Sequence, residues 1–351
     1  MPKTIAELDT PCVLIDVDKV EANLKRAQDH ANANGYALRP HTKTHKLPFF
    51  ARRQVELGAR GITVQKLGEA EVMADAGLTD IFLPYNIIGE RKLARLKALN
   101  ERVTLAVTAD SPDTVAGYAR TFSSGKPLTV LVECDTGTMR CGVQSPAQAL
   151  ALARQIGMAP GLSFGGLMTY PPAKKLDQAE AWLREAIDLL NQAGIAVPKV
   201  TSGNTPDIWR TGQSVVTERR PGTYIYYDRM QVAAGAADWD DCALTVLATV
   251  VSRPTPTRIV LDAGSKALSS DIGNLTGYGQ LMGTDITLKF LNEEHGVIEL
   301  AAPSDSPRIG ERVRIVPNHV CVVTNLFSEV NLVAGDSVVD TLPVAARGRV
   351  D

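Results

Sequence analysis

Four titratable side chains crowd into the segment 39–46 (RPHTKTHK), where His41 and His45 alternate with Lys43 and Lys46. The two histidines are part of a total of only five in the chain. A lysine surrounded by cationic groups has a lowered pKa and a larger nucleophilic fraction near neutral pH. A lysine that forms a Schiff base needs this property. Residue types and spacing therefore leave two interpretations open, a solvated basic loop and the floor of an active site.

A second reactive pair lies in the segment 317–323 (PNHVCVV), which we expect to be a strand. Side chains two positions apart on a strand face the same way, so His319 and Cys321 would project side by side. Imidazole and thiolate are ligands that suit zinc, and a site with only two protein ligands leaves positions for water and substrate. The alternative is a core histidine beside a buried thiol, and these residues alone leave both interpretations open.

The elements that must position these groups alternate along the chain as far as residue 226. Eight strand-like runs alternate with helical patterns over roughly 200 residues, which predicts a (β/α)8 barrel of the TIM type. A doubly wound open sheet is the alternative. The strands are expected at residues 37–42, 61–64, 80–84, 103–108, 128–134, 162–169, 199–202 and 222–226. Helices are expected at residues 18–34, 67–76, 90–99, 112–122, 146–155 and 176–193.

The pattern changes after Asp228, where short strands are broken by Gly, Pro and Asp and no convincing helix appears. An all-β domain is therefore predicted at the C-terminal end, and we expect a strand at residues 11–17 to pair into its sheet. The predicted domains are residues 17–235 for the barrel, and residues 1–16 with 236–351 for the β domain that carries His319 and Cys321. Its strands are expected at residues 244–251, 257–262, 286–290, 296–300, 312–315 and 338–344.

Polar residues follow the ends of the predicted barrel strands, which is where active sites of such barrels lie. Two of these ends, the segments 202–207 (SGNTPD) and 221–224 (PGTY), combine hydroxyls with a glycine that allows close backbone approach. Barrels commonly bind phosphate between the loops after strands seven and eight, so these segments predict a phosphate site. The alternative is that loops are simply polar.

Bulk composition argues against several classes of function. A net charge of −2 with 22% charged residues argues against nucleic-acid binding and against disorder. The chain starts without an apolar signal core, and no run of about eighteen uncharged apolar residues occurs, so we expect a cytoplasmic protein with no membrane partner. The five cysteines are scattered without a CxxC pair, which argues against a disulfide framework.

The segment 39–46 resembles the pyridoxal-phosphate (PLP) lysine motif of the D-serine dehydratase and D-threonine aldolase family. This resemblance implies the alanine-racemase-like fold (fold type III), in which a PLP-binding (β/α)8 barrel is joined to a β domain, in a homodimer. The similarity continues in order through Gln65 with the segment 68–71 (GEAE), and through the segments 135–143, 166–170, 202–205, 221–224, 262–266, 293–296 and 317–321.

The resemblance also implies roles for single residues. Lys43 would form the Schiff base with PLP and act as a base, and Tyr170 and His41 complete the predicted catalytic set. His319 and Cys321 would bind the metal, with zinc expected and manganese second. The remaining predicted cofactor-binding residues are Gln65, Arg140 near the ring, Tyr170 along the ring and substrate side, and Ser202, Gly203, Asn204, Gly222, Thr223 and Tyr224 around the phosphate.

The activity implied by the resemblance is that of a PLP- and metal-dependent lyase acting on a D-3-hydroxy amino acid. Removal of the α-proton with loss of hydroxide would give a 2-oxo acid and ammonia, whereas deprotonation of the hydroxyl would give glycine and an aldehyde. The dehydratase is favoured, because His-x-Cys metal pairs look dehydratase-like and aldolases tend to show His-x-Asp. Aldolases also tend to carry a histidine soon after the strand-six tyrosine, but Tyr170 is followed by PPAKK. The segments 170–172 and 83–86 are typical of neither subgroup, so the natural substrate stays open.

Two other classes are weaker alternatives. An amino-acid racemase of the same fold would pair Lys43 with a tyrosine and need no metal, and the His319–Cys321 pair argues against it. A non-catalytic PLP-binding protein would resemble the barrel alone, and the additional β domain argues against it.

Overall fold

The computed structural model describes residues 3–123 and 125–351, which form two compact units. The barrel unit contains residues 27–43, 48–222 and 349–351, and the β unit contains residues 3–26, 44–47 and 223–348. The predicted domain boundaries, after residue 16 and after residue 235, stay a prediction. Within the described ranges, no helix has the length and apolar character needed to span a membrane.

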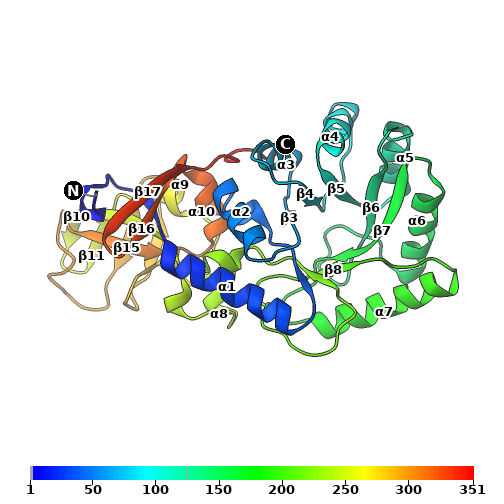
Figure 1. Ribbon diagram of the computed structural model, residues 1–351. Helices are drawn as coiled ribbons and strands as arrows, with labels where there is room; N and C mark the ends of the chain where they lie inside the picture. The colour runs from blue at the N-terminus through cyan, green and yellow to red at the C-terminus, as the bar shows by residue number, and fades with distance from the viewer. Residues whose placement is uncertain (1–2, 124) are drawn as a thin grey trace. The chain divides into compact units, whose positions relative to one another are not determined.

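Eight parallel strands make up the sheet of the barrel unit, in the order β2-β9-β8-β7-β6-β5-β4-β3. Figure 1 labels β3 to β8 of this sheet. Backbone hydrogen bonds join its two ends, since Arg60 N donates to Leu38 O (2.9 Å) and Thr63 N donates to Pro40 O (2.7 Å). The predicted (β/α)8 barrel is therefore confirmed. The strands are β2 (Ala37–Leu38), β3 (Ile62–Thr63), β4 (Asp80–Leu83), β5 (Thr104–Ala109), β6 (Leu128–Cys134), β7 (Leu162–Thr169), β8 (Val200–Ser202) and β9 (Glu218–Arg219).

The position predicted for the last barrel strand is wrong. That strand is β9, in which Glu218 pairs with Ala37, whereas residues 222–226 contain the 3-10 helix η3 (Thr223–Ile225). The amides of Tyr226 and Tyr227 both return to the carbonyl of Thr223 (3.0 and 2.7 Å), which an extended chain cannot do. Aromatic and β-branched residues gave this turn the composition of a strand.

The barrel helices begin close to where the sequence predicts them, because their starts carry local signals. Ser111 Oγ accepts a hydrogen bond from Thr114 N and Ser145 Oγ accepts one from Gln148 N, and a proline follows each serine. These serines cap α5 and α6. The long helices are α1 (Val17–Ala33), α2 (Pro48–Glu56), α3 (Leu67–Asp75), α4 (Glu90–Arg102), α5 (Pro112–Thr121), α6 (Pro146–Met158) and α7 (Leu176–Gln192).

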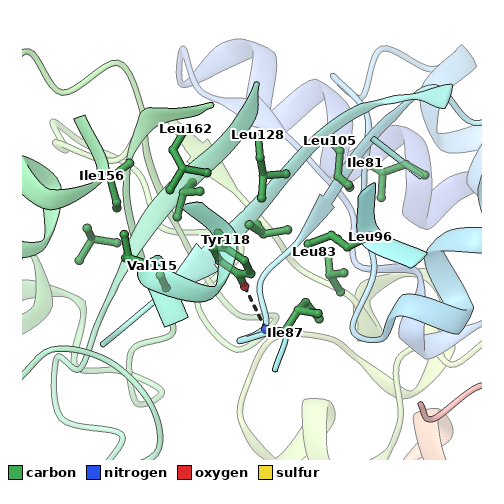
Figure 2. Close-up of a cluster of buried hydrophobic side chains, with 14 of the residues drawn as sticks. Ile81, Leu83, Ile87, Leu96, Leu105, Val115, Tyr118, Leu128, Ile156 and Leu162 are labelled. Carbon is green, nitrogen blue, oxygen red and sulfur yellow. Dashed lines mark hydrogen bonds between the residues drawn. The ribbon is translucent and has the colours of Figure 1, made fainter. Parts of the chain in front are cut away.

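A continuous apolar cluster packs the barrel strands against their covering helices (Figure 2). Tyr118 is completely buried in it, and its hydroxyl accepts a hydrogen bond from Ile87 N (2.9 Å) and donates one to Thr108 O (3.0 Å). The polar end of this ring is thus satisfied inside the core. Packing of this kind gives the carboxyl ends of the strands a rigid base for a site.

The β unit is built around β1 (Cys12–Asp16), which pairs antiparallel with β10 (Leu244–Thr255) and parallel with β16 (Glu329–Ala334). The prediction that this first strand joins the C-terminal sheet is confirmed. The strand β10 also pairs with β11 and with β15. The other strands are β11 (Arg258–Leu261), β12 (Gln280–Leu281), β13 (Leu288–Leu291), β14 (Gly296–Glu299), β15 (Arg312–Val316) and β17 (Ser337–Pro343).

The expectation that no helix follows Asp228 is wrong. The short α-helices α8 (Arg229–Ala233), α9 (Ser265–Leu268) and α10 (Val320–Leu326) occur in this part of the chain. The last of these replaces the strand predicted at residues 317–323. Asp228 Oδ2 accepts a hydrogen bond from Val320 N (3.1 Å), so a distant carboxylate satisfies the first amide of α10. This contact outweighs the strand preference of the β-branched run.

Candidate active site

Residues 41–47 form a turn that is buried except at one lysine. Lys43 lies in the 3-10 helix η2 (Thr42–Thr44) and is half-buried, whereas the other residues of the turn are buried. Thr42 Oγ1 donates a hydrogen bond to Thr63 O (3.1 Å), which ties the turn to β3. The interpretation as a solvated basic loop is therefore wrong. Lys43 is the amine that this turn leaves accessible.

His41 holds the backbone of this turn. Its Nε2 lies 3.0 Å from Gln65 Oε1, and its Nδ1 lies 3.4 Å from Lys43 N. An amide oxygen can only accept a hydrogen bond and a backbone N–H can only donate one, so these contacts select the neutral imidazole protonated at Nε2. The predicted site residues His41, Lys43 and Gln65 are thus linked by hydrogen bonds.

Arg140 and Tyr170, both predicted to lie beside the cofactor ring, are neighbours. Arg140 Cζ lies 5.0 Å from the centre of the Tyr170 ring, a cation–π contact. The loop before Arg140 is shaped by Asp135, whose Oδ1 accepts hydrogen bonds from the backbone N–H groups of residues 137–139. Partial burial opposes ionisation, but these hydrogen bonds outweigh it and lower the pKa of Asp135. The loop therefore carries a fixed negative charge at its start.

Ser202, Gly203 and Asn204 form a buried polar turn at the carboxyl end of β8. Gly203 has a φ of 109°, which favours glycine, and a Cβ at this position would lie 3.4 Å from Arg220 N. Asn204 Oδ1 accepts a hydrogen bond from Asp207 N (3.0 Å). The Ser202 hydroxyl and the Gly203 N–H lie next to each other in the chain, and Gly203 has no side chain to cover its N–H. This combination suits a phosphate group.

The second predicted phosphate segment is divided between the two units. Gly222 belongs to the barrel unit, whereas Thr223 and Tyr224 open η3 of the β unit. Tyr224 is buried, and Thr223 Oγ1 lies 3.7 Å from Cys321 Sγ. Thr223 therefore lies beside a predicted metal ligand as well as in the predicted phosphate segment.

His319 and Cys321 lie at the start of α10, where His319 is the N-cap residue and Cys321 is in the first turn. The argument from strand geometry is wrong, yet the start of the helix also brings the two side chains together. Burial alone would lower the pKa of His319, but the hydrogen bond and the charge of Cys321, together with Asp271, raise it to about 10. Cys321 Sγ also lies 3.1 Å from Thr44 Oγ1.

Asp271 is a site residue that sequence reasoning missed. Its Oδ2 lies 2.6 Å from His319 Nδ1 across 48 positions of sequence, and no local pattern marks it. Metal-bound histidines commonly pair their second ring nitrogen with a carboxylate, which leaves Nε2 of His319 for a metal. Among the described residues, no group of three or more His, Cys, Asp and Glu side chains could hold a metal. One imidazole and one thiol thus fit a divalent metal that keeps positions for water and substrate.

Arg220 is a second residue that sequence reasoning missed. This buried side chain donates hydrogen bonds from Nη2 to Thr169 O (2.7 Å) and from Nε to Thr201 Oγ1 (2.9 Å). Burial lowers its pKa to about 10. Arg220 therefore connects the ends of the two strands that precede Tyr170 and Ser202. The paired arginines directly before the PGTY segment were the only sequence signal for it.

Comparisons with known proteins cover both units. The model of the alanine racemase N-terminal domain matches residues 15–230, and that of the putative serine dehydratase domain matches residues 243–333. The chain is 35% identical to a D-threonine aldolase from Arthrobacter sp over 98% of this chain and 94% of the relative. It is 33% identical to a D-threo-3-hydroxyaspartate dehydratase from Delftia sp. over 97% of this chain and 98% of the relative.

Solved structures agree with these relatives. The D-threonine aldolase from Filomicrobium marinum superposes with a TM-score of 0.92 at 30% identity, covering 100% of this chain and 99% of that chain. The Delftia dehydratase superposes with a TM-score of 0.90 at 31% identity, covering 97% of this chain and 98% of that chain. Similar solved structures also include a histidine-to-alanine variant of a D-threo-3-hydroxyaspartate dehydratase and a cysteine-to-alanine variant in the metal-free form, at positions two residues apart. The chain therefore belongs to the PLP-dependent D-serine dehydratase and D-threonine aldolase family, which has metal-dependent members and the alanine-racemase-like fold that its motifs predict.

Proposed function

We propose that this protein is a PLP- and metal-dependent dehydratase that converts a D-3-hydroxy amino acid into a 2-oxo acid and ammonia. Family membership supports a lyase of this substrate class. The observation that carries the choice of dehydration is the pairing of His319 with Cys321 at the start of α10, with Asp271 behind the imidazole.

Residues of the barrel unit fit PLP. Lys43 would hold its aldehyde carbon, Arg140 and Tyr170 would lie beside the ring, and Ser202 and Gly203 would hold the phosphate. Bound PLP supplies an electron sink for the negative charge that develops at Cα when a proton leaves. The Lys43 amine is the base proposed to take that proton. His41 fixes the backbone of Lys43 through Nδ1 and is therefore proposed as a positioning residue.

His319 and Cys321 would hold the metal, and we propose zinc, with manganese second, because imidazole and thiolate suit it. A bound divalent ion supplies a Lewis acid that makes the substrate hydroxyl a better leaving group. Asp271 orients His319 by accepting a hydrogen bond from Nδ1–H, which leaves Nε2 as the ligand atom. Thr44, the residue after Lys43 in the sequence, contacts the Cys321 thiol and fixes its position.

Two observations support elimination over retro-aldol cleavage. The spacing and types of His319 and Cys321 match the histidine and cysteine that were substituted in structures of a D-threo-3-hydroxyaspartate dehydratase, and the structure of the cysteine variant is in the metal-free form. The segment 171–175 (PPAKK) also places no histidine directly after Tyr170, so it offers no base for the substrate hydroxyl there.

Retro-aldol cleavage to glycine and an aldehyde is the second candidate. The 35% identity to a D-threonine aldolase over 98% of this chain favours it. Both reactions start from the same class of substrate, so only the products separate them.

Product analysis tests the proposal. The protein loaded with PLP and zinc is incubated separately with D-serine, D-threonine and 3-hydroxy-D-aspartate, and with the L-enantiomers as controls. Ammonia and a 2-oxo acid in equal amounts are expected from at least one D-substrate. Formation of glycine and an aldehyde would show instead that the protein is an aldolase. Formation of the opposite enantiomer would show that it is a racemase.

A further inference from the structure

The GEAE segment at residues 68–71 belongs to the family resemblance, yet none of its side chains has a role in the proposed reaction. Residues 349–351 pack against Gly68, near the start of α3. The N–H of Gly68 donates to Asp351 O (3.2 Å), and a Cβ at this position would lie 2.6 Å from Asp351 Oδ1 and 3.3 Å from Arg349 Cβ. The amide of Gly68 is one of the first four of α3, which have no partner inside the helix. A side chain at position 68 would crowd Asp351 and Arg349, so residues 349–351 would have to shift away from this helix start.

Arg95 of α4 is the second anchor of this segment. Its Nε and Nη2 donate to the two carboxylate oxygens of Glu71 (2.8 and 2.7 Å), and its Nη1 donates to Asp351 Oδ2 (2.7 Å). A bidentate arginine–carboxylate pair has a defined geometry, so the contact with Glu71 orients Nη1 of Arg95 towards Asp351. The hydrogen bond from Arg95 lowers the pKa of Asp351 and keeps it ionised.

The same helix start holds residues of the candidate site. Glu69 Oε2 accepts hydrogen bonds from Gln65 N (2.8 Å) and Lys66 N (3.2 Å). Gln65 Oε1 in turn meets His41 Nε2, and His41 Nδ1 meets Lys43 N. Gly68, Glu69 and Glu71 of the GEAE segment thus connect residues 349–351 with the residues that precede α3 and, through Gln65, with the lysine turn.

We propose that residues 349–351 are a positioning element of the active site. Anchored by Gly68 and Arg95, they hold the start of α3 and so keep Gln65 and His41 in the geometry that orients Lys43. The inference rests on the proposed function only in taking Lys43 as the reacting amine.

The test compares Arg95→Ala, Asp351→Asn and Gly68→Ala with the matched control Arg102→Ala. Arg102 also joins α4 to α3, through its Nη2 and Asp75 Oδ1 (2.5 Å), but at the opposite end of α3. The full chain is studied without cofactor, metal or substrate. Amide hydrogen exchange is measured for residues 64–75 and 39–47, and the ring ¹⁵N signals of His41 are recorded and assigned with His41→Gln.

We expect amides at residues 65–70 to exchange about tenfold faster in the three test variants. Arg95→Ala and Asp351→Asn weaken the hydrogen bond between the two charged groups, and Gly68→Ala disturbs the packing of residues 349–351 against α3. The His41 signals should move away from those of the Nε2-protonated imidazole. Arg102→Ala should change neither readout near the lysine turn.

Test variants that match Arg102→Ala in both readouts would overturn the proposal. Faster exchange near Gly68 with unchanged His41 signals would overturn it as well, because it would show a purely local role. Absence of lyase activity in the wild-type protein would instead refute the proposed function. It would leave these two readouts intact, so the two failures are distinguishable.

Discussion

Asp271 Oδ2 lies 2.6 Å from His319 Nδ1, and this contact decides which ring nitrogen of His319 is left for a ligand. The carboxylate accepts a hydrogen bond from Nδ1–H, so in the neutral imidazole Nε2 is the ring nitrogen left to bind a metal. Cys321 is hydrogen bonded to the same imidazole. The start of α10 therefore offers one nitrogen and one sulfur donor in a fixed relation.

Asp271→Ala is expected to weaken metal binding about 10- to 100-fold, because the imidazole loses the partner that orients it. Competition with a chromogenic chelator measures the metal Kd directly. Asp285→Ala is the matched control, since Asp285 is an exposed aspartate of the same unit. Equal metal affinity of Asp271→Ala and the wild-type protein would contradict the role of Asp271.

Lys43→Ala is expected to remove the visible absorbance band of bound PLP and to abolish turnover. The reason is that Lys43 is the accessible amine of an otherwise buried turn. Absorbance spectra after dialysis against PLP-free buffer check the first expectation, and the product assay checks the second. The exposed Lys289 supplies the control variant Lys289→Ala, which should keep both properties. A band that survives dialysis in Lys43→Ala would place the Schiff base on another lysine.

Cys321→Ala is expected to lose its metal and its lyase activity while it keeps the PLP band. A single imidazole remains as protein donor in this variant, which is too few for stable binding of zinc. Metal analysis by mass spectrometry and the absorbance spectrum are recorded on the same sample. Cys141→Ala, at an exposed thiol, is the control. Full activity of the wild-type protein after rigorous chelation would refute the metal-assisted mechanism.

The sequence predicted the barrel well because the signals of its elements are local. Aliphatic runs mark β4 to β7, and serine followed by proline marks the starts of α5 and α6. Residues 222–226 were misassigned because aromatic and β-branched residues give this local turn the composition of a strand. Residues 317–323 were misassigned because a contact from elsewhere decides their conformation. Asp228 caps α10 from a distant part of the chain, and no periodicity within residues 317–323 contains that information.

The residues of the candidate site also differ in whether the sequence could predict them. Lys43 and Gln65 follow strands in segments with a recognisable motif, and the structure links both to His41. Asp271 and Arg220 act through tertiary contacts, with His319 and with the strand ends at Thr169 and Thr201, and neither lies in a motif that marks its role. Motifs can identify residues that carry chemistry, whereas residues that orient them are visible only once the chain is folded.

The barrel unit also contains a buried ion cluster. Arg39 Nε lies 2.8 Å from Glu218 Oε2, and its Nη1 lies 2.7 Å from Asp80 Oδ1. Lys199 Nζ lies 3.4 Å from the same oxygen of Glu218. Burial alone would raise the pKa of Glu218, but the positive charges of Arg39 and Lys199 hold it below its ordinary value of 4.5.

Glu218→Gln is expected to lower the free energy of unfolding by about 3 kcal/mol at pH 7, because it leaves the buried Arg39 with one carboxylate fewer. The pKa of Glu218 is lower in the folded protein than in the unfolded chain, so its stabilisation is complete above the unfolded value. It is lost as the pH falls through the folded value. Urea unfolding between pH 7 and pH 3 should therefore show wild type and variant converging in stability below about pH 4.5. Glu101→Gln, at an exposed position of α4, should track the wild-type protein throughout. A stability difference for Glu218→Gln that stays constant with pH would mean that the carboxylate is not the source of the stabilisation.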